Sequence, residues 1–357
     1  MEQLDTPAGG HPELLSVIVP AYNEEAVLPE FHRRLAEVLR TIDMHAEIIY
    51  INDGSQDATL DVIRRFKQTD DSVTLIDLSR NFGKEAAMTA GFDLAAGDAI
   101  VIIDADLQDP PELIADMVRH WRAGYDMVYA QRTVREGESR LKKLTAYLFY
   151  RLIRTASRVH IPRDTGDFRL LSRRAVHALN CLREQHRFMK GLFAWIGFPQ
   201  KALPYRRDAR FAGESKFNYW KLWNFALDGF TSFTIAPLKV ATYLGVTTAL
   251  IAFLYAGYVV VRTTLYGNPV SGYPSLMVVI TFLGGAQLAF IGILGEYLGR
   301  MFNETKQRPL YFLNAYEPAS SAMRRDRPAL SAGPAAGIVG AGQSGRVEQT
   351  AGRQHDE

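Results

Sequence analysis

The sequence predicts an α/β domain with a mostly parallel sheet, followed by two C-terminal transmembrane helices. Between residues 14 and 130, short β-branched apolar runs alternate with segments whose apolar residues recur at helical spacing. Near-continuous apolar strands separated by helices imply a parallel sheet that is covered on both faces. Further along, two stretches without charge are each long enough to cross a hydrocarbon core of about 30 Å.

Five runs have the apolar composition of buried strands: 15–20, 47–52, 73–78, 99–103 and 127–130. The first two segments between them place their apolar residues on one helical face, namely Leu28, Phe31, Leu35, Val38 and Leu39, then Leu60, Ile63 and Phe66. Ligands of parallel sheets bind at the carboxyl ends of the strands, so the polar residues just past each strand are the functional candidates.

Composition excludes several classes of protein. The 357 residues suit one large or two medium domains, and 41 Lys and Arg against 39 Asp and Glu exclude a nucleic-acid binder that works by bulk charge. One cysteine, Cys181, excludes a disulfide framework or cysteine zinc cluster and fits a reducing compartment. Residues 1–13 are polar, so we expect a flexible N-terminus without a signal peptide.

The two uncharged stretches predict a transmembrane hairpin over 236–300. They are Val240–Val261 and Thr263–Gly295, with a Gly- and Pro-containing loop at 266–275 between the apolar parts. A pair of buried core helices is the alternative. Arg262 is the lone basic residue in the connection, whereas the flanks carry Lys221, Lys239, Arg300, Lys306 and Arg308. This bias predicts that both termini are cytoplasmic, at the inner membrane.

Three further segments complete the predicted organisation. Residues 132–174 hold twelve Lys and Arg against four acids, interleaved with apolar residues. This pattern predicts membrane-surface helices at about 133–160, the alternative being a solvated charged helix. They would belong to the α/β domain, which we place at 14–230. After the hairpin we expect a cytoplasmic segment, 301–317. The tail, 318–357, is rich in Ala, Gly and Ser and is predicted to be disordered.

Polar residues follow the first two strands. The first ends in P-A-Y-N-E-E at residues 20–25, without the glycine-rich loop of a Rossmann or Walker phosphate site. The second ends in Asn52-Asp53-Gly54-Ser55, where Asp53 is expected to accept hydrogen bonds from a base or ribose. Asp57 lies at the start of the next helix, where it could bind a ligand or simply cap the helix N-terminus.

The fourth strand runs directly into Asp104 and Asp106. Two acids after a buried strand are unfavourable unless they meet a cation. Carboxylate oxygens suit Mg²⁺ or Mn²⁺, which also bind substrate phosphates. The alternative is a capped turn before Pro110, which explains Asp109 but not Asp104.

Five motifs in order carry a family resemblance: V-I-V-P-A-Y-N-E-E, I-N-D-G-S-Q-D, S-R-N-F-G-K-E, D-A-D-L-Q-D-P-P-E and R-F-A-G-E-S-K. Together, from about residue 14 to 308, they resemble family-2 inverting glycosyltransferases that act on polyprenyl phosphates, and the layout looks most like the bactoprenol glucosyltransferase branch. The resemblance implies a glycosyltransferase A fold, a UDP- or GDP-sugar donor, a divalent metal, and transfer of a hexose, foremost glucose, to undecaprenyl phosphate.

The resemblance also implies roles for residues on the donor side. The uridine pocket would be lined by Pro20, Tyr22, Glu24 and Asp53. The metal would be held by Asp104, Asp106 and Gln108. Lys84 and Arg132 would bind the donor phosphates. The alternative for Lys84 is that it is a surface residue at the start of a helix.

On the acceptor side, the lipid phosphate would be bound by Arg210, Ser215, Lys216 and Arg169. The D-T-G-D-F-R element at 164–169 makes Asp167 the catalytic candidate. The second pKa of a phosphomonoester is about 6, so the acceptor phosphate is already ionised at neutral pH. Asp167 could therefore act either as a general base or as a residue that positions the substrates. The metal, Lys84 and Arg132 would neutralise the leaving nucleotide during one inverting displacement.

Three alternatives remain open at the level of sequence. The same chemistry could use GDP-mannose, UDP-GlcNAc or an aminoarabinose donor. A processive polysaccharide synthase would need a Q-x-x-R-W motif, which we do not find. A non-catalytic nucleotide-binding scaffold or flippase partner is the third. The expected partners are a nucleotide sugar, polyprenyl phosphate, the bilayer and, as a further option, other copies of the chain, but not nucleic acid.

Overall fold

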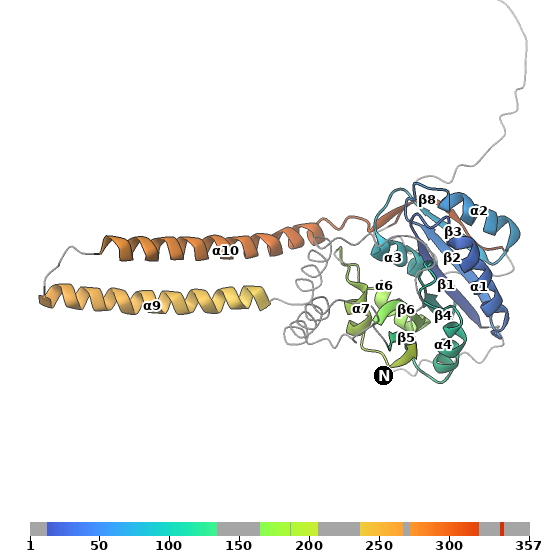
Figure 1. The fold of residues 1–357 in the computed structure, drawn as a ribbon, viewed down its shortest axis with the longest axis horizontal. Helices are drawn as coiled ribbons and strands as arrows, with labels where there is room; N and C mark the ends of the chain where they lie inside the picture. Colours follow the sequence, from blue (N-terminus) through green and yellow to red (C-terminus); the bar gives the residue numbers. More distant parts are fainter. Residues whose placement is uncertain are drawn as a thin grey trace, which may run out of the picture.

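The computed structural model describes residues 13–133, 165–185, 187–205, 236–266, 272–320 and 336–338. Figure 1 shows a sheet domain from which two long helices extend. The predicted membrane-surface helices at 133–160, the N-terminal residues 1–12 and most of the tail lie outside the described residues.

The described strands form one mixed sheet in the order β7-β5-β6-β4-β1-β2-β3-β8-β9. Their bounds are β1 (Leu14–Ala21), β2 (His45–Asn52), β3 (Val73–Leu78), β4 (Ala99–Ile102), β5 (Met127–Arg132), β6 (Thr165–Ser172), β7 (Gln200–Tyr205), β8 (Tyr311–Glu317) and β9 (Ala336–Ile338). The central pairs β1–β2, β1–β4 and β2–β3 are parallel, which confirms the predicted core. The order reverses at β1 and β4, the usual place for a ligand in such sheets.

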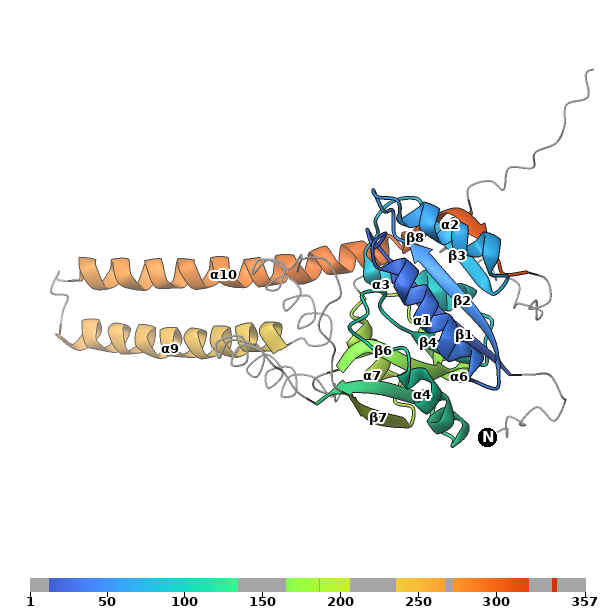
Figure 2. The same ribbon diagram turned by 45° about the vertical axis from the view of Figure 1, so that its right-hand side comes forward.

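Helices cover both faces of the sheet (Figure 2). One core layer contains residues from α1 (Leu28–Arg40), α2 (Thr59–Thr69) and α4 (Leu113–Arg122). The other contains residues from α3 (Lys84–Leu94), α6 (Arg173–Asn180) and α7 (Met189–Trp195). In β1, Val17 and Val19 enter the first layer and Ile18 the second, which is the alternation that a strand buried on both faces requires.

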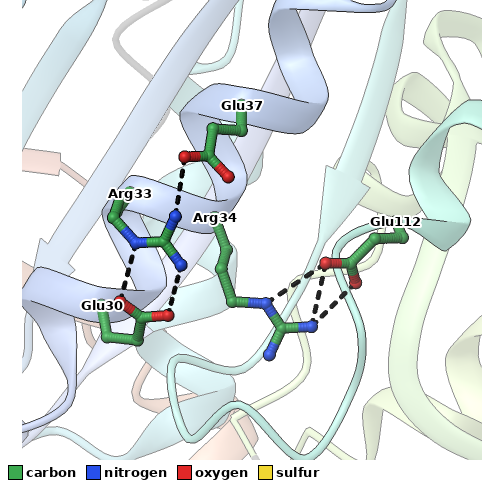
Figure 3. Close-up of polar contacts among 5 residues, drawn as sticks. All are labelled: Glu30, Arg33, Arg34, Glu37 and Glu112. Carbon is green, nitrogen blue, oxygen red and sulfur yellow. Dashed lines mark hydrogen bonds and ion pairs between the residues drawn. The ribbon is translucent and has the colours of Figure 1, made fainter.

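Helix α1 connects to the loop that follows β4 through charged side chains. Arg33 pairs with Glu30 and Glu37 within the helix, and Arg34 reaches Glu112, with Nη2 2.9 Å from Oε1 (Figure 3). These pairs are largely exposed, so each contributes little to stability. Buried Leu28, Phe31 and Leu35 on the opposite side of α1 provide its main attachment to the sheet.

Two long helices follow the sheet domain, α9 (Ala236–Tyr266) and α10 (Tyr273–Thr305). They lie side by side in both views (Figures 1 and 2). Large apolar side chains are exposed on both, among them Leu254 and Leu288 at 63% and 72%. Among the described residues, one segment, Phe282–Thr305, has both the length and the hydropathy to cross a membrane. The second predicted span therefore stays a prediction.

The chain returns from α10 to the sheet. Residues 311–317, which the sequence assigned to a separate cytoplasmic segment, form β8 and pair antiparallel with β3. Three residues of the predicted disordered tail, 336–338, form β9 beside it. Asn314 Nδ2 donates to Asp77 Oδ2 at 2.7 Å, and Tyr311 is 3% exposed. The hairpin is thus followed by a further strand of the same sheet, which covers the edge that β3 would otherwise leave unpaired.

The backbone is tightly packed around Gly54, which lies just past β2. Its φ is +62°, and an added Cβ would lie 2.4 Å from Arg80 C and Asn81 N. We expect Gly54→Ala to lower the free energy of unfolding by more than about 3 kcal/mol. The control is Gly124→Ala, where φ is +97° but nothing lies within 4 Å of the new Cβ. That variant should lose only about 1–2 kcal/mol. Equal losses in thermal unfolding in detergent would contradict this account of the packing.

Candidate active site

The loops after β1 and β2 are joined by hydrogen bonds. Asn23, at φ +55°, accepts from the Gln56 amide at Oδ1 (2.8 Å), and its own amide donates to Ser55 Oγ (3.0 Å). The Glu24 amide donates to Thr59 Oγ1 at 2.8 Å. Three predicted uridine-pocket residues at the end of β1 and in the loop after it are half-buried, namely Pro20, Tyr22 and Glu24. They therefore have accessible surface at the carboxyl edge of the sheet.

Asp53 is placed more deeply than its predicted role requires. Asp53 is 3% exposed, and its carboxylate accepts hydrogen bonds from the backbone amides of Phe82 (2.7 Å) and Gly83 (3.0 Å). Burial raises the pKa of Asp53, and these two hydrogen bonds oppose that rise. Asp53 thus fixes the loop that leads into α3, and its contact with a base or ribose stays a prediction.

Lys84 brings two separate carboxylates together. Its Nζ lies 2.6 Å from Asp104 Oδ1 and 2.5 Å from Asp167 Oδ2. Asp104 follows β4, Asp167 lies in β6, and Lys84 begins α3, so three elements meet at one ammonium group. Lys84 starts α3 and its side chain is 39% exposed, as the surface alternative expects, but its ammonium is paired with both acids, and its contact with donor phosphates stays a prediction.

The charges of this cluster reinforce one another. Burial by itself would lower the pKa of Lys84, but Asp104 and Asp167 raise it well above its ordinary value. Burial would likewise raise the pKa of Asp167, but Lys84 and Lys190 hold it well below its ordinary value. Asp167 is therefore a carboxylate at every physiological pH.

The loop after β4 holds its second acid in a strained turn. Leu107 adopts φ +58°, which is rare for a large side chain, and the Gln108 amide donates to Asp106 Oδ1 at 3.1 Å. Strain of this kind concentrates at functional turns. No group of three or more His, Cys, Asp or Glu suited to a metal is found among the described residues. Two carboxylates nonetheless fit Mg²⁺ or Mn²⁺, because these ions use one or two carboxylates together with phosphate oxygens and water.

Arg169 does not lie where the sequence placed it. It is 4% exposed, donates from Nη2 to the Gly166 carbonyl at 2.8 Å, and stacks over Phe193 with 3.8 Å between its Cζ and the ring centroid. Burial lowers its pKa to about 10. Arg169 is buried two residues after the half-buried Asp167 on β6, so it packs within the sheet domain, whereas contact with a lipid phosphate would need it to move.

Glu85 is a site residue that sequence reasoning missed. It follows Lys84 in the first turn of α3, and among the described residues its buried Oε2 has no hydrogen-bond partner. Burial and the charge of Asp167 raise its pKa to about 8. Its place in the S-R-N-F-G-K-E motif was the available signal, but the sequence contains nothing that shows it to be buried.

The remaining predicted residues divide into two groups. Arg132, at the end of β5, is half-buried and donates from Nε to Tyr205 Oη at 3.3 Å. Burial would lower its pKa, but the hydrogen bond with Tyr205 and the nearby acids raise it. The predicted acceptor residues Arg210, Ser215 and Lys216 lie outside the described residues.

Known proteins resemble this chain along nearly its whole described length. The model of "Glycosyl transferase family 2" matches residues 16–179, and that of "GtrB C-terminal hairpin" matches 236–301. An uncharacterised glycosyltransferase of Synechocystis is 51% identical over 300 residues, covering 84% of this chain and 94% of that protein. The chain belongs to glycosyl transferase family 2. Its resemblance to the polyprenyl-phosphate branch of the family is thereby confirmed.

Other members of family 2 have more specific names. The bactoprenol glucosyl transferase of Shigella phage SfV is 48% identical, covering 84% of this chain and 97% of that protein. A prophage bactoprenol glucosyl transferase homolog of Escherichia coli is 46% identical, with shares of 84% and 98%. Among solved structures, glucosyl-3-phosphoglycerate synthase of Mycobacterium tuberculosis aligns over 60% of this chain and 76% of that one, at 20% identity and a TM-score of 0.41.

Proposed function

We propose that this protein transfers glucose from UDP-glucose to a polyprenyl phosphate, with inversion at the anomeric carbon. The lipid-linked sugar would serve modification of a cell-surface glycan. One observation carries the proposal. The 48% identity to the bactoprenol glucosyl transferase of phage SfV spans 97% of that protein, and therefore both the sheet domain and the hairpin.

The arrangement of charges supports this chemistry. The donor diphosphate and the acceptor phosphate are both anionic, so a site that joins them must offer positive charge. Lys84 lies between the acid that follows β4 and the acid of β6. This is where a donor held at the Asp104 side and an acceptor held at the Asp167 side would meet. Lys84 would thus offset negative charge as it moves from the acceptor to the leaving nucleotide.

Asp104 and Asp106, with Gln108, would hold Mg²⁺ or Mn²⁺. When bound, the ion would neutralise charge on the leaving diphosphate. Asp167 is ionised and paired with Lys84, so it would orient the reacting groups through that ammonium. An acceptor phosphate that is already ionised needs no base, and we therefore assign Asp167 a positioning role in the transfer.

We further propose that the hairpin anchors the enzyme in the inner membrane with both termini cytoplasmic. The flanking Lys and Arg residues support this orientation, and the exposed apolar surface of α9 and α10 supports burial in lipid. The segment at 133–160 would lie on the membrane surface, and Arg210, Ser215 and Lys216 would bind the lipid phosphate there. A homo-oligomer is compatible with this arrangement.

A donor panel tests the proposal. Purified full-length protein is incubated with undecaprenyl phosphate, Mg²⁺ or Mn²⁺, and radiolabelled UDP-glucose, GDP-mannose or UDP-GlcNAc. We expect labelled lipid with UDP-glucose, and at least a hundredfold less after Asp106→Asn or in excess EDTA. The matched control is Asp116→Asn, because Asp116 is an exposed acid on α4 outside the site. No transfer from any donor would refute the function, whereas full turnover in EDTA would refute the metal requirement alone.

A further inference from the structure

Tyr205 ends β7 beside the residue that ends β5. The two strands run parallel, and Arg132 and Tyr205 are partners in their register. The Tyr205 residue is 6% exposed. Its hydroxyl donates to the Asp109 carboxylate and accepts a hydrogen bond from Arg132 Nε at 3.3 Å. One hydroxyl therefore joins a buried acid to an arginine.

The three linked residues lie beside the acidic loop after β4 and beside β6, the strand of Asp167. Asp109 is 1% exposed and lies in the loop that begins with the Asp104 and Asp106 carboxylates. Arg132 also borders the strand of Asp167, because a Cβ added at Gly166 would lie 3.2 Å from Arg132 Nη2 and 3.8 Å from Asp109 Oδ2. A shift of the Tyr205 hydroxyl would thus displace side chains both in the acidic loop and next to Asp167.

The chemistry of a phenol suits this position. Burial, together with the charge of Asp109, raises the pKa of Tyr205 to about 12, so the hydroxyl keeps its proton. It can therefore donate to the carboxylate and accept from the guanidinium at once, which neither Phe nor a charged residue could do. The hydrogen bond to Tyr205 uses Nε of Arg132, so it does not consume the two terminal nitrogens of the guanidinium.

Without the hydroxyl, the opposite charges of Arg132 and Asp109 would pull the guanidinium directly onto the acid. The terminal nitrogens would then bind Asp109, and fewer would remain for an anionic ligand. The hydroxyl separates the two charges while it fixes both in place. We propose that Tyr205 is a positioning residue that holds Arg132 ready for the donor diphosphate and locks the acidic loop, an inference that rests on the proposed function.

The test compares Tyr205→Phe with a matched tyrosine. Tyr311 also donates to a carboxylate, Asp93 Oδ2 at 2.8 Å, which in turn pairs with Arg183, and it is 3% exposed. Tyr311→Phe thus removes a similar buried hydrogen bond outside the site. We expect Tyr205→Phe to lower kcat/KM for UDP-glucose about tenfold to a hundredfold, with an unchanged KM for undecaprenyl phosphate. Tyr311→Phe should lower the melting temperature similarly but leave both kinetic parameters unchanged.

Two further measurements separate the possible failures. Asp109→Ala removes the acceptor of the same hydrogen bond and should reproduce the kinetic change even if Tyr205→Phe folds poorly. Calorimetry of UDP binding with Mg²⁺ should show a Kd raised about tenfold in Tyr205→Phe. Wild-type turnover with unchanged kinetics in both variants would overturn the positioning role. If the wild-type protein transfers no sugar, the proposed function fails, and an unchanged UDP Kd in Tyr205→Phe would then overturn the positioning role as well.

Discussion

Lys84→Met should reduce kcat by about a hundredfold to a thousandfold while the protein remains folded. The ammonium lies 2.6 Å from Asp104 and 2.5 Å from Asp167, so its loss leaves two carboxylates facing each other. Two phosphate-bearing substrates would then meet a site with one positive charge fewer, where preorganised charge is worth most. Steady-state kinetics with UDP-glucose and undecaprenyl phosphate, together with thermal unfolding in detergent, measure both effects.

Lys67→Met is the matched control for this variant. Lys67 Nζ also makes two close contacts, with the carbonyls of Val73 (3.2 Å) and Pro318 (2.7 Å), but these join α2 to the start of β3 and to the residue after β8. Its loss should lower the melting temperature without lowering kcat. If Lys84→Met keeps wild-type kcat, or if both variants lose activity in proportion to stability, the role of Lys84 in charge neutralisation is wrong.

The activity should fall above pH 8, by up to about tenfold per pH unit, because Glu85 then ionises. Its pKa of about 8 means that the side chain is neutral below this pH and negative above it. The charged groups that face it are Asp167 on β6, Lys84 on α3, and Lys190 and Arg187 on and before α7. A new negative charge among them would weaken binding of an acceptor phosphate. The measurement is kcat/KM for undecaprenyl phosphate from pH 6 to 9.5.

Glu85→Gln should flatten this decline, because the amide has no proton to lose. It should also stabilise the protein more at pH 8 than at pH 5. The pKa of Glu85 is higher in the folded than in the unfolded protein. The free energy of unfolding is therefore highest below about pH 4.5 and falls as the pH rises towards 8. Glutamine does not ionise, so the variant does not lose this stability. The control is Glu184→Gln, because burial also raises the pKa of Glu184 outside the site. A decline that persists in Glu85→Gln would assign the pH dependence to another group.

Much of the fold could be predicted because its signals are local. A strand buried on both faces needs a continuous apolar run, and a covering helix needs apolar residues at intervals of three and four. The runs at 15–20, 47–52 and 73–78 therefore predicted three of the central strands. Acids directly after a buried strand, such as Asp104, conflict with burial in any fold, so they could be chosen as candidate ligand-binding residues before their surroundings were known.

Other features depend on residues that only packing brings together. Lys84 and Asp167 are 83 positions apart, and no periodicity relates them. Strand β8 lies in a segment that nothing in the sequence joins to the sheet, and its pairing with β3, far away along the chain, is evident only in the folded structure. The stacking of Arg169 on Phe193 and the hydrogen bonds from the loop before α3 to Asp53 likewise depend on which elements pack together.

The sequence by itself determined the family, the order of the central strands and helices, and the chemical character of the edge where ligands bind. The tertiary structure decided which charges neutralise one another there, that Glu85 and Tyr205 belong to the site, and that the chain returns from the hairpin to the sheet. The physical reason is the distance along the chain over which each effect acts. Propensity and periodicity act over a few residues, whereas a pKa or an ion pair depends on every charge and every layer of burial around it.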